Sequence, residues 1–280
     1  MKKSTFFHLH LVSDATGETL INVGRAAAAQ YDSAQAREHI YTMVRSEKDI
    51  ARVVDEIEAS PGIVLYTLIE PTHAALLEER CRELGVPALS VLDPILSLFQ
   101  TYLGAKSSQR AGAQHALDTE YFRRIDALNY TLSHDDGQLS EDVSDADVVI
   151  IGISRTSKTP TSIYLANRGV KAANIPLIPD VPPPEHLGQS GKAFVVGLIA
   201  SPDRIVQIRQ HRLLSINADT RDTSYIDKHV VAEEIAFTRR LCARKGWPII
   251  DVTRRSIEET AAAILTLYNN HLSRLEKSDD

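Results

Sequence analysis

Two cationic side chains and one hydroxyl near the middle of the chain have the types and spacing for phosphate chemistry. Lys158 and Thr159 follow a short polar loop, and Arg155 lies three residues before the lysine. A lysine ammonium offers a point charge to phosphate oxygens, and a threonine hydroxyl placed next to it can ligate Mg²⁺. Arg155 adds a second cation that could clamp a phosphoryl group during transfer. These residues therefore indicate phosphate binding with a metal ion at Thr159.

The pattern around them is that of a phosphate-binding loop (P-loop), G-x-x-x-x-G-K-[ST]. An apolar, β-branched run at 148–151 predicts a buried strand before the loop, and the residues from Pro160 onward suit a helix. Backbone N–H groups at such a helix N-terminus attract an anion. One position departs: Ser157 replaces the second glycine, and a positive φ there would cost ~1 kcal/mol. The alternative is an ordinary polar connection.

The predicted phosphate-binding segment is continuous. It comprises Gly152, Ile153, Ser154, Arg155, Thr156, Ser157, Lys158 and Thr159.

Transfer to a hydroxyl also requires a carboxylate that orients or deprotonates the nucleophile. The candidates are Asp135, Asp136 and Asp180. His134 adjoins the first two and could tune them or accept a proton itself. The residues alone favour a surface turn for the segment ending in Gly137, since Asp-Gly is a strong turn signal. Asp180 ends a short apolar segment at 173–180, which is either a strand near the metal or a proline-rich loop.

Two groups of residues near the N-terminus have side chains that could bind a ligand. His8 and His10 lie two residues apart, so they share one face of a strand and could ligate a metal. No third ligand is evident, so we expect histidines satisfied within the sheet. The polar segment 13–19 follows this strand, where α/β sheets bind ligands, but we expect it to be a helix start capped by Ser13 or Asp14.

Strand and helix patterns alternate along the chain, which predicts parallel α/β sheets with right-handed crossovers. At 280 residues the chain suits one large or two modest domains. We expect an N-terminal parallel-sheet α/β domain at 1–104, a linker and helix carrying the HDDG motif at 105–147, and a P-loop kinase-like α/β domain at 148–280. The expected strands are 6–12, 36–44, 63–68, 88–92, 148–151, 193–200 and 248–252, and the expected helices include 20–31, 47–60, 71–84, 117–130 and 227–245.

Composition excludes several classes of function. The net charge is −6 without a long basic run, which argues against non-specific nucleic-acid binding. No stretch approaches the ~18 apolar residues of a membrane span. The two cysteines, Cys81 and Cys242, do not form a disulfide framework and fit a reducing cytoplasm. The sequence therefore predicts a cytoplasmic protein that acts without membrane or nucleic acid.

Three long motifs, HLHLVSDATGET, NYTLSHDDG and GISRTSKTPTSIYLA, resemble those of the bacterial pyruvate, phosphate dikinase regulatory proteins. The similarity extends from about Phe7 to Leu272. A sister family regulates phosphoenolpyruvate synthase, and its loop typically reads S-R-C-G-K-T. Thr156 and Ser157 resemble the dikinase branch, as does the first motif.

The resemblance implies a bifunctional serine/threonine protein kinase and phosphorylase. Its kinase activity would use ADP to phosphorylate a threonine beside the catalytic histidine of the dikinase, releasing AMP and inactivating that enzyme. Its second activity would use inorganic phosphate to remove the group as pyrophosphate. The resemblance assigns 152–159 to ADP, with Mg²⁺ expected, and favours roles for His134, Asp135 and Asp136 without saying which is the base.

Other functions fit the same loop. The chain could act on phosphoenolpyruvate synthase, or it could be a small-molecule kinase with Arg204, Arg209 and Arg212 as a phosphate clamp. It could also be a non-catalytic nucleotide sensor in which Ser157 signals lost chemistry. The oligomeric state, including a homo-oligomer, is left open by the sequence.

Overall fold

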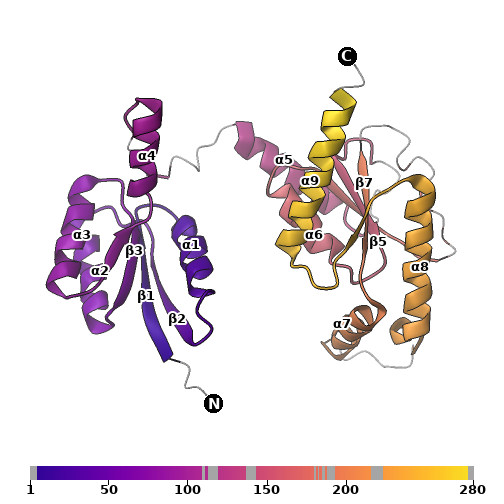
Figure 1. Ribbon diagram of the computed structural model, residues 1–280, viewed down its shortest axis with the longest axis horizontal. Helices are drawn as coiled ribbons and strands as arrows, with labels where there is room; N and C mark the ends of the chain where they lie inside the picture. Colours follow the sequence, from indigo (N-terminus) through magenta and orange to yellow (C-terminus); the bar gives the residue numbers. More distant parts are fainter. Residues whose placement is uncertain are drawn as a thin grey trace. The chain divides into compact units, whose positions relative to one another are not determined.

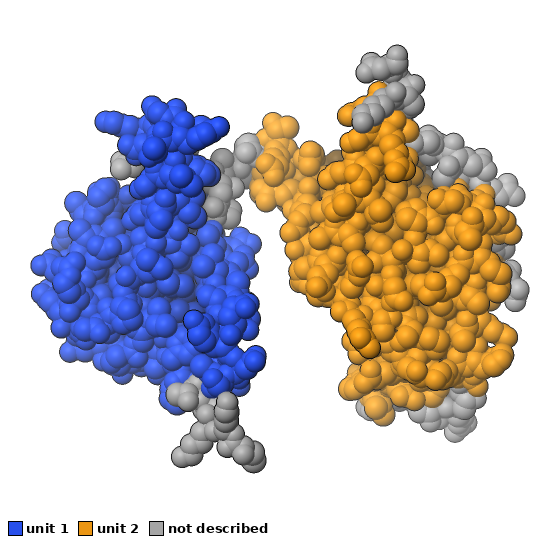
Figure 2. All heavy atoms as spheres, viewed as in Figure 1, with its two compact units in different colours: residues 1–116 blue, residues 117–280 orange. Residues whose placement is uncertain are grey.

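The computed structural model describes residues 5–108, 111–112, 119–136, 143–179, 181, 183–184, 187, 193–215 and 223–276. The chain divides into two compact units, Met1–Ala116 (unit 1) and Leu117–Asp280 (unit 2) (Figure 2). Each unit is built on its own four-stranded parallel sheet with helices around it (Figure 1). The predicted α/β class is confirmed, with one parallel sheet before the P-loop segment and one containing it.

Unit 1 has the strand order β2-β1-β3-β4, and every neighbouring pair is parallel. Side chains alternate along β1, so that Leu9 and Leu11 pack with Leu20 of α1, whereas Val12 joins a second core with Tyr66 on the opposite face. Helices α2 and α3 cover that second face (Figure 1). The elements are β1 Thr5–Ser13, α1 Glu18–Ala28, β2 Ala34–Tyr41, α2 Glu47–Ala59, β3 Gly62–Thr67, α3 Pro71–Glu83, β4 Ala88–Ser90 and α4 Asp93–Leu103.

The strand histidines are satisfied by neighbours, as expected. His10 is fully buried between the Tyr41 hydroxyl, 3.0 Å from Nδ1, and the Ser60 carbonyl, 2.8 Å from Nε2. Burial lowers the pKa of His10 and favours its neutral form. His8 Nδ1 lies 2.8 Å from His39 Nε2. Nowhere in the described parts of the chain do three His, Cys, Asp or Glu side chains gather as metal ligands.

The expected cap of α1 is wrong. The helix begins at Glu18, and Gly17 occupies the N-cap position at φ 78° without a side-chain cap. Ser13 Oγ instead accepts the Ala15 N–H at 3.1 Å, and Asp14 Oδ2 accepts the Ile69 N–H at 2.7 Å. The Asp14 bond ties the turn to the residues that follow β3, and neither side chain caps the helix.

Unit 2 has the parallel strand order β6-β5-β7-β8, and β5 is buried along its whole length. Helices α6 and α9 supply Leu165 and Ile264 to the core on one face, and α8 supplies Leu241 on the other. Helix α5 packs against β6 and α6 and so is part of this unit. The elements are α5 Thr119–Ser133, β5 Val148–Gly152, α6 Lys158–Ala166, β6 Ala172–Pro176, β7 Phe194–Ile199, α7 Pro202–Ser215, the 3₁₀ helix η2 Thr223–Ile226, α8 Lys228–Lys245, β8 Ile249–Asp251 and α9 Ile257–Glu276.

Two differences from the sequence expectation matter for the site. The ambiguous segment at 173–180 does contain a strand, β6, while Asp180 lies outside the described residues. Helix α5 continues three residues past its expected end at Tyr130, so His134 follows it directly. None of the helices within the described residues is both long and apolar enough to cross a membrane.

Candidate active site

The P-loop leaves β5 at a position that requires glycine. A Cβ added to Gly152, at φ 157°, would lie 2.5 Å from the Leu198 carbonyl oxygen of β7. The loop then turns through two left-handed residues, Arg155 at φ 72° and Ser157 at φ 61°. Ser157 is the N-cap residue of α6. Ser157 thus adopts the left-handed conformation in which glycine is favoured. The loop therefore makes the same turn with a serine at the position of the second glycine.

Lys158 is the first residue of α6 and is only 5% exposed. Its Nζ donates to the Ile153 carbonyl at 3.0 Å, and Thr156 Oγ1 donates to the same oxygen at 2.9 Å. Burial lowers the pKa of Lys158 to about 8, against the opposing effect of Asp136 and Asp135. The ammonium is therefore held inside the loop, where a phosphate would offer it an anionic partner.

Thr159 and Asp135 meet beside the loop, and a residue that the sequence did not single out joins them. Thr159 Oγ1 donates to Asp135 Oδ1 at 2.9 Å. Asn174 of β6 donates its Nδ2 to the same carboxylate at 2.6 Å and to Thr159 Oγ1 at 3.0 Å. The Asn174 side chain is buried, and its Oδ1 has no hydrogen-bond partner among the described residues. Asn174 is the one polar residue of an otherwise apolar strand beside β5, which is the signal that could have revealed it.

This cluster suits a magnesium ion. A hydroxyl, a carboxylate and an amide oxygen are the hard oxygen donors that Mg²⁺ prefers. The unpartnered Asn174 Oδ1 is an acceptor that a metal-bound water could satisfy. Thr159, the predicted metal ligand, thus has Asp135 as a neighbour of suitable chemistry.

His134 and Asp136 flank Asp135 but differ in their surroundings. His134 is buried, its Nδ1 donates to the Tyr130 carbonyl at 2.8 Å, and its ring stacks on Tyr130 at 3.9 Å. The His134 carbonyl accepts the Asn174 N–H at 2.9 Å, which ties the end of α5 to β6. Asp136, at φ 54°, lines a cavity of about 540 Å³ together with the P-loop. The cavity is lined by Asp136, Ser154, Arg155, Ser157, Lys158, Thr159, Pro160, Pro176, Leu177, Ile178 and Ile208.

The structure therefore assembles most of the predicted site. Lys158, Thr159, Arg155 and Asp136 share this cavity, and Asp135 bonds directly to Thr159. His134 is not among the described residues that line the cavity.

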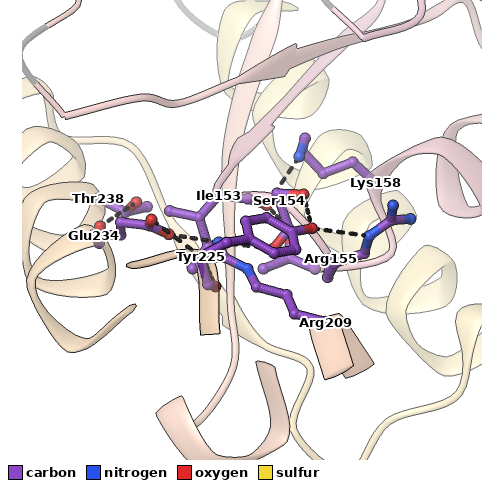
Figure 3. A network of polar contacts seen from close by, with 9 residues as sticks. Ile153, Ser154, Arg155, Lys158, Arg209, Tyr225, Glu234 and Thr238 are labelled. Carbon is purple, nitrogen blue, oxygen red and sulfur yellow. Dashed lines mark hydrogen bonds and ion pairs between the residues drawn. The ribbon is translucent and has the colours of Figure 1, made fainter. Parts of the chain in front are cut away.

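A buried ion pair supports the loop from behind (Figure 3). Arg209 of α7 is 1% exposed, and its Nη2 lies 2.5 Å from Glu234 Oε2 of α8. Its guanidinium also donates to the Tyr225 carbonyl at 2.9 Å and to the Ser154 carbonyl at 3.5 Å. Three separate elements are thereby joined to the P-loop backbone.

Tyr225 links this support to Ser154 and Arg155 of the loop (Figure 3). Its ring lies under the Arg209 guanidinium at 4.5 Å, and its hydroxyl lies 3.4 Å from both Ser154 Oγ and Arg155 Nε. Burial raises the pKa of Tyr225, but the contacts with Ser154, Arg155 and Arg209 together lower it overall.

Of the three arginines on α7, only Arg209 reaches the loop, and it does so through the ion pair. Arg204 and Arg212 are exposed on the helix surface. The phosphate clamp considered for these three residues is therefore absent among the described residues that line the cavity.

Comparisons with known proteins agree with this geometry. Residues 9–265 match the kinase/pyrophosphorylase family. A relative from Sinorhizobium fredii is 58% identical over 265 residues, covering 95% of this chain and 97% of the relative. Relatives from Bradyrhizobium diazoefficiens and Brucella ovis are 57% and 59% identical over 267 residues, covering 95% of this chain and 96% and 95% of the relatives. All three bear the name pyruvate, phosphate dikinase regulatory protein.

Proposed function

Because this chain belongs to the kinase/pyrophosphorylase family, we propose that it regulates pyruvate, phosphate dikinase by phosphoryl transfer in two directions. Membership supports a phosphotransferase activity, and the names of the relatives support the target. In the proposed kinase reaction, ADP phosphorylates a dikinase threonine and AMP leaves. In the proposed reverse reaction, inorganic phosphate removes the phosphoryl group from that threonine, and pyrophosphate leaves. The observation that carries the proposal is one cavity lined by Lys158, Arg155, Thr159 and Asp136.

One anion cradle suffices for both directions. The loop N–H groups and Lys158 hold the diphosphate of ADP in one direction, and inorganic phosphate in the other. Arg155 lines the same cavity and stabilises charge on the phosphoryl group that moves. Phosphoryl transfer depends mostly on such positioning and electrostatics, which is why the two reactions need no separate sites.

The metal-facing residues would be Thr159 and Asp135, with Asn174 orienting both through its amide. Mg²⁺ bound there would neutralise charge on the phosphate oxygens. The amide of Asn174 fixes the carboxylate and the hydroxyl in one arrangement, so that the site is formed before nucleotide arrives.

Asp136 is the best candidate for the base. Asp135 is engaged by Thr159 and Asn174, whereas Asp136 lines the cavity where the acceptor threonine must enter. In the kinase direction the threonine Oγ bonds to the β-phosphorus, the bond from that phosphorus to the AMP oxygen breaks, and Asp136 takes the hydroxyl proton. In the reverse direction a phosphate oxygen bonds to the phosphothreonine phosphorus, and Asp136 returns a proton to the leaving Oγ.

The decisive experiment is a donor comparison. We expect the protein, ADP and histidine-phosphorylated dikinase to yield phosphothreonine and AMP, and phosphate to reverse this with pyrophosphate formation. Efficient modification with ATP and none with ADP would contradict the proposal. A parallel assay with phosphoenolpyruvate synthase tests the choice of target, and turnover on a metabolite without any protein acceptor would point to a small-molecule kinase.

A further inference from the structure

Tyr225 of η2 divides its contacts between two partners. Its backbone carbonyl accepts from Arg209 Nη1 at 2.9 Å, and the centroid of its ring lies 4.5 Å from Arg209 Cζ. Its hydroxyl instead lies 3.4 Å from both Ser154 Oγ and Arg155 Nε of the P-loop (Figure 3). The ring and the carbonyl therefore fix Tyr225 in the fold, and the hydroxyl is left for the loop.

The Arg155 side chain has little else to hold it. Arg155 is an exposed residue that lines the cavity at the P-loop. Within the described part of the chain, its guanidinium makes one hydrogen bond, from Nε to the Tyr225 hydroxyl. An exposed arginine loses much rotamer freedom when it binds a ligand, and a partner that already holds it reduces that loss. The Tyr225 hydroxyl is thus the group that can keep Arg155 in one position.

The hydrogen bond to Tyr225 leaves the phosphate-binding end of Arg155 free. The Nε–H group can only donate, so the Tyr225 oxygen accepts, and the Tyr225 proton can go to Ser154 Oγ. The two terminal nitrogens of Arg155 point away from Tyr225 (Figure 3). These nitrogens carry the remaining N–H donors, which can bind two phosphate oxygens in parallel. Tyr225 therefore orients Arg155 without using those donors.

We propose that Tyr225 is a positioning residue for phosphoryl transfer, which acts by holding Arg155 where charge develops on the transferred group. This inference rests on the proposed function and adds to it a residue from outside the P-loop. Donors that are already in place stabilise a transition state best, because they need no reorganisation during the reaction. Loss of the hydroxyl should therefore slow transfer more than it weakens ADP binding, which relies on the loop N–H groups and Lys158.

The test is a double-mutant cycle of Tyr225→Phe and Arg155→Ala, measured with the full chain, ADP and histidine-phosphorylated dikinase. Tyr225→Phe removes only the hydroxyl, so kcat should fall about ten- to a hundredfold while KM for ADP stays the same. Arg155→Ala should lower kcat by about 10²–10³. The double variant should be no slower than Arg155→Ala alone, because Tyr225 acts through Arg155. The phosphate-dependent reaction should give the same pattern.

Tyr164→Phe is the matched control. Tyr164 also pairs with an arginine, since its hydroxyl accepts from Arg168 Nη2 at 2.7 Å and its ring centroid lies 4.0 Å from Arg168 Cζ. Neither residue is among the described residues that line the cavity, so this variant should keep the native kcat. The proposal would be overturned by a native kcat in Tyr225→Phe, by an equal loss in Tyr164→Phe, or by losses of Tyr225→Phe and Arg155→Ala that multiply in the double variant.

A second measurement on the same four proteins does not depend on activity. The near-ultraviolet absorbance of tyrosinate, compared with and without Tyr225, isolates this residue among the nine tyrosines. Burial raises the pKa of Tyr225, but the contacts with Ser154, Arg155 and Arg209 together lower it overall. The pKa of Tyr225 should therefore rise in Arg155→Ala, because a nearby positive charge stabilises tyrosinate. Arg209 and Glu234, the other charged groups beside Tyr225, are present in all four proteins.

The two measurements separate this inference from the proposed function. A native chain that transfers phosphate, combined with a Tyr225 pKa that does not rise in Arg155→Ala, would overturn the inference alone. A native chain that transfers no phosphate in either direction would overturn the proposed function, whatever the titration of Tyr225 gave.

Discussion

Lys158 must carry a positive charge to bind phosphate, yet its position disfavours that charge. The side chain is 5% exposed, and desolvation lowers its pKa to about 8 despite the two nearby aspartates. In the protein without ligand, the Lys158 ammonium therefore loses its proton around pH 8, which is easily reached in solution. An anionic ligand restores the charged form, because a nearby opposite charge raises a lysine pKa.

This predicts that ADP affinity falls as pH rises through about 8. The loss should approach tenfold per pH unit above that value, since each binding event must first protonate the lysine. Lys158→Arg is the matched control, because guanidinium stays charged throughout and its affinity should remain flat from about pH 7 to 9.5. Calorimetric titration measures both. A flat profile for the native protein would show that Lys158 keeps its proton in the empty loop.

The stability of the folded protein should rise with pH, whereas the affinity for ADP falls. The folded pKa of Lys158 lies below its unfolded value near 10.4, so the unfolded chain binds more protons between about 8 and 10.4. The contribution of Lys158 to the free energy of unfolding therefore rises with pH through that window, and it does not rise below the window. Denaturant titrations of the native protein and Lys158→Arg at several pH values isolate the contribution.

The paired aspartates should differ when each is replaced by asparagine. Asp136→Asn should lower kcat by about 10² or more and leave KM for ADP nearly unchanged, because it removes the base and not a phosphate contact. Asp135→Asn should instead raise the Mg²⁺ concentration needed for half-maximal ADP binding, because it weakens the cluster with Thr159 and Asn174. Asp126→Asn, on the exposed surface of α5, is the control. Interchanged phenotypes would reverse the proposed roles.

At the level of elements, the P-loop contacts α7 and η2 and is linked through Arg209 to α8. Arg209 and Glu234 lie far apart in the sequence and meet only because these elements fold behind the loop (Figure 3). Tyr225 extends that support to Ser154 and Arg155 through long contacts of 3.4 Å. The arrangement holds Arg155 before any phosphate arrives.

Removing one partner of this buried pair should destabilise the protein strongly. Glu234→Gln leaves the Arg209 guanidinium buried without a carboxylate, and we expect a loss of about 3 kcal/mol in urea denaturation. Replacing both Arg209 and Glu234 by methionine should cost less than Glu234→Gln alone, because no unpaired charge remains. If Glu234→Gln proved as stable as the native protein, the pair would not be a structural support.

Sequence patterns predicted the elements well but not the contacts between distant ones. The P-loop strand and helix were predictable because β-branching and a proline at the first helical turn are local signals. The cap of α1 was predicted wrongly because Asp14 bonds to Ile69, 55 residues away. Tyr225 was not predicted for the same reason: its partners come from other elements, and no local spacing indicates them. The single polar residue of an apolar strand marks Asn174, but its partners Asp135 and Thr159 also come from other parts of the chain.

At the level of the whole molecule, each unit contains its own sheet and its own cores, and the predicted nucleotide site lies wholly in unit 2. Ligand that binds only the folded form of unit 2 stabilises that unit by mass action, with no reason to stabilise unit 1 directly. Unfolding of the chain should therefore depart from a single two-state transition when ligand is present.

Hydrogen exchange can resolve this difference. We expect saturating ADP to slow exchange of backbone amides in β5, β6 and α6, where the loop and the Thr159 cluster lie, while β1 and β3 of unit 1 exchange at unchanged rates. Lys158→Ala should abolish the effect in unit 2, which separates site binding from non-specific stabilisation. Equal protection of both sheets would mean that the two units unfold as one cooperative body, and the sites and cores would then have to be treated as coupled.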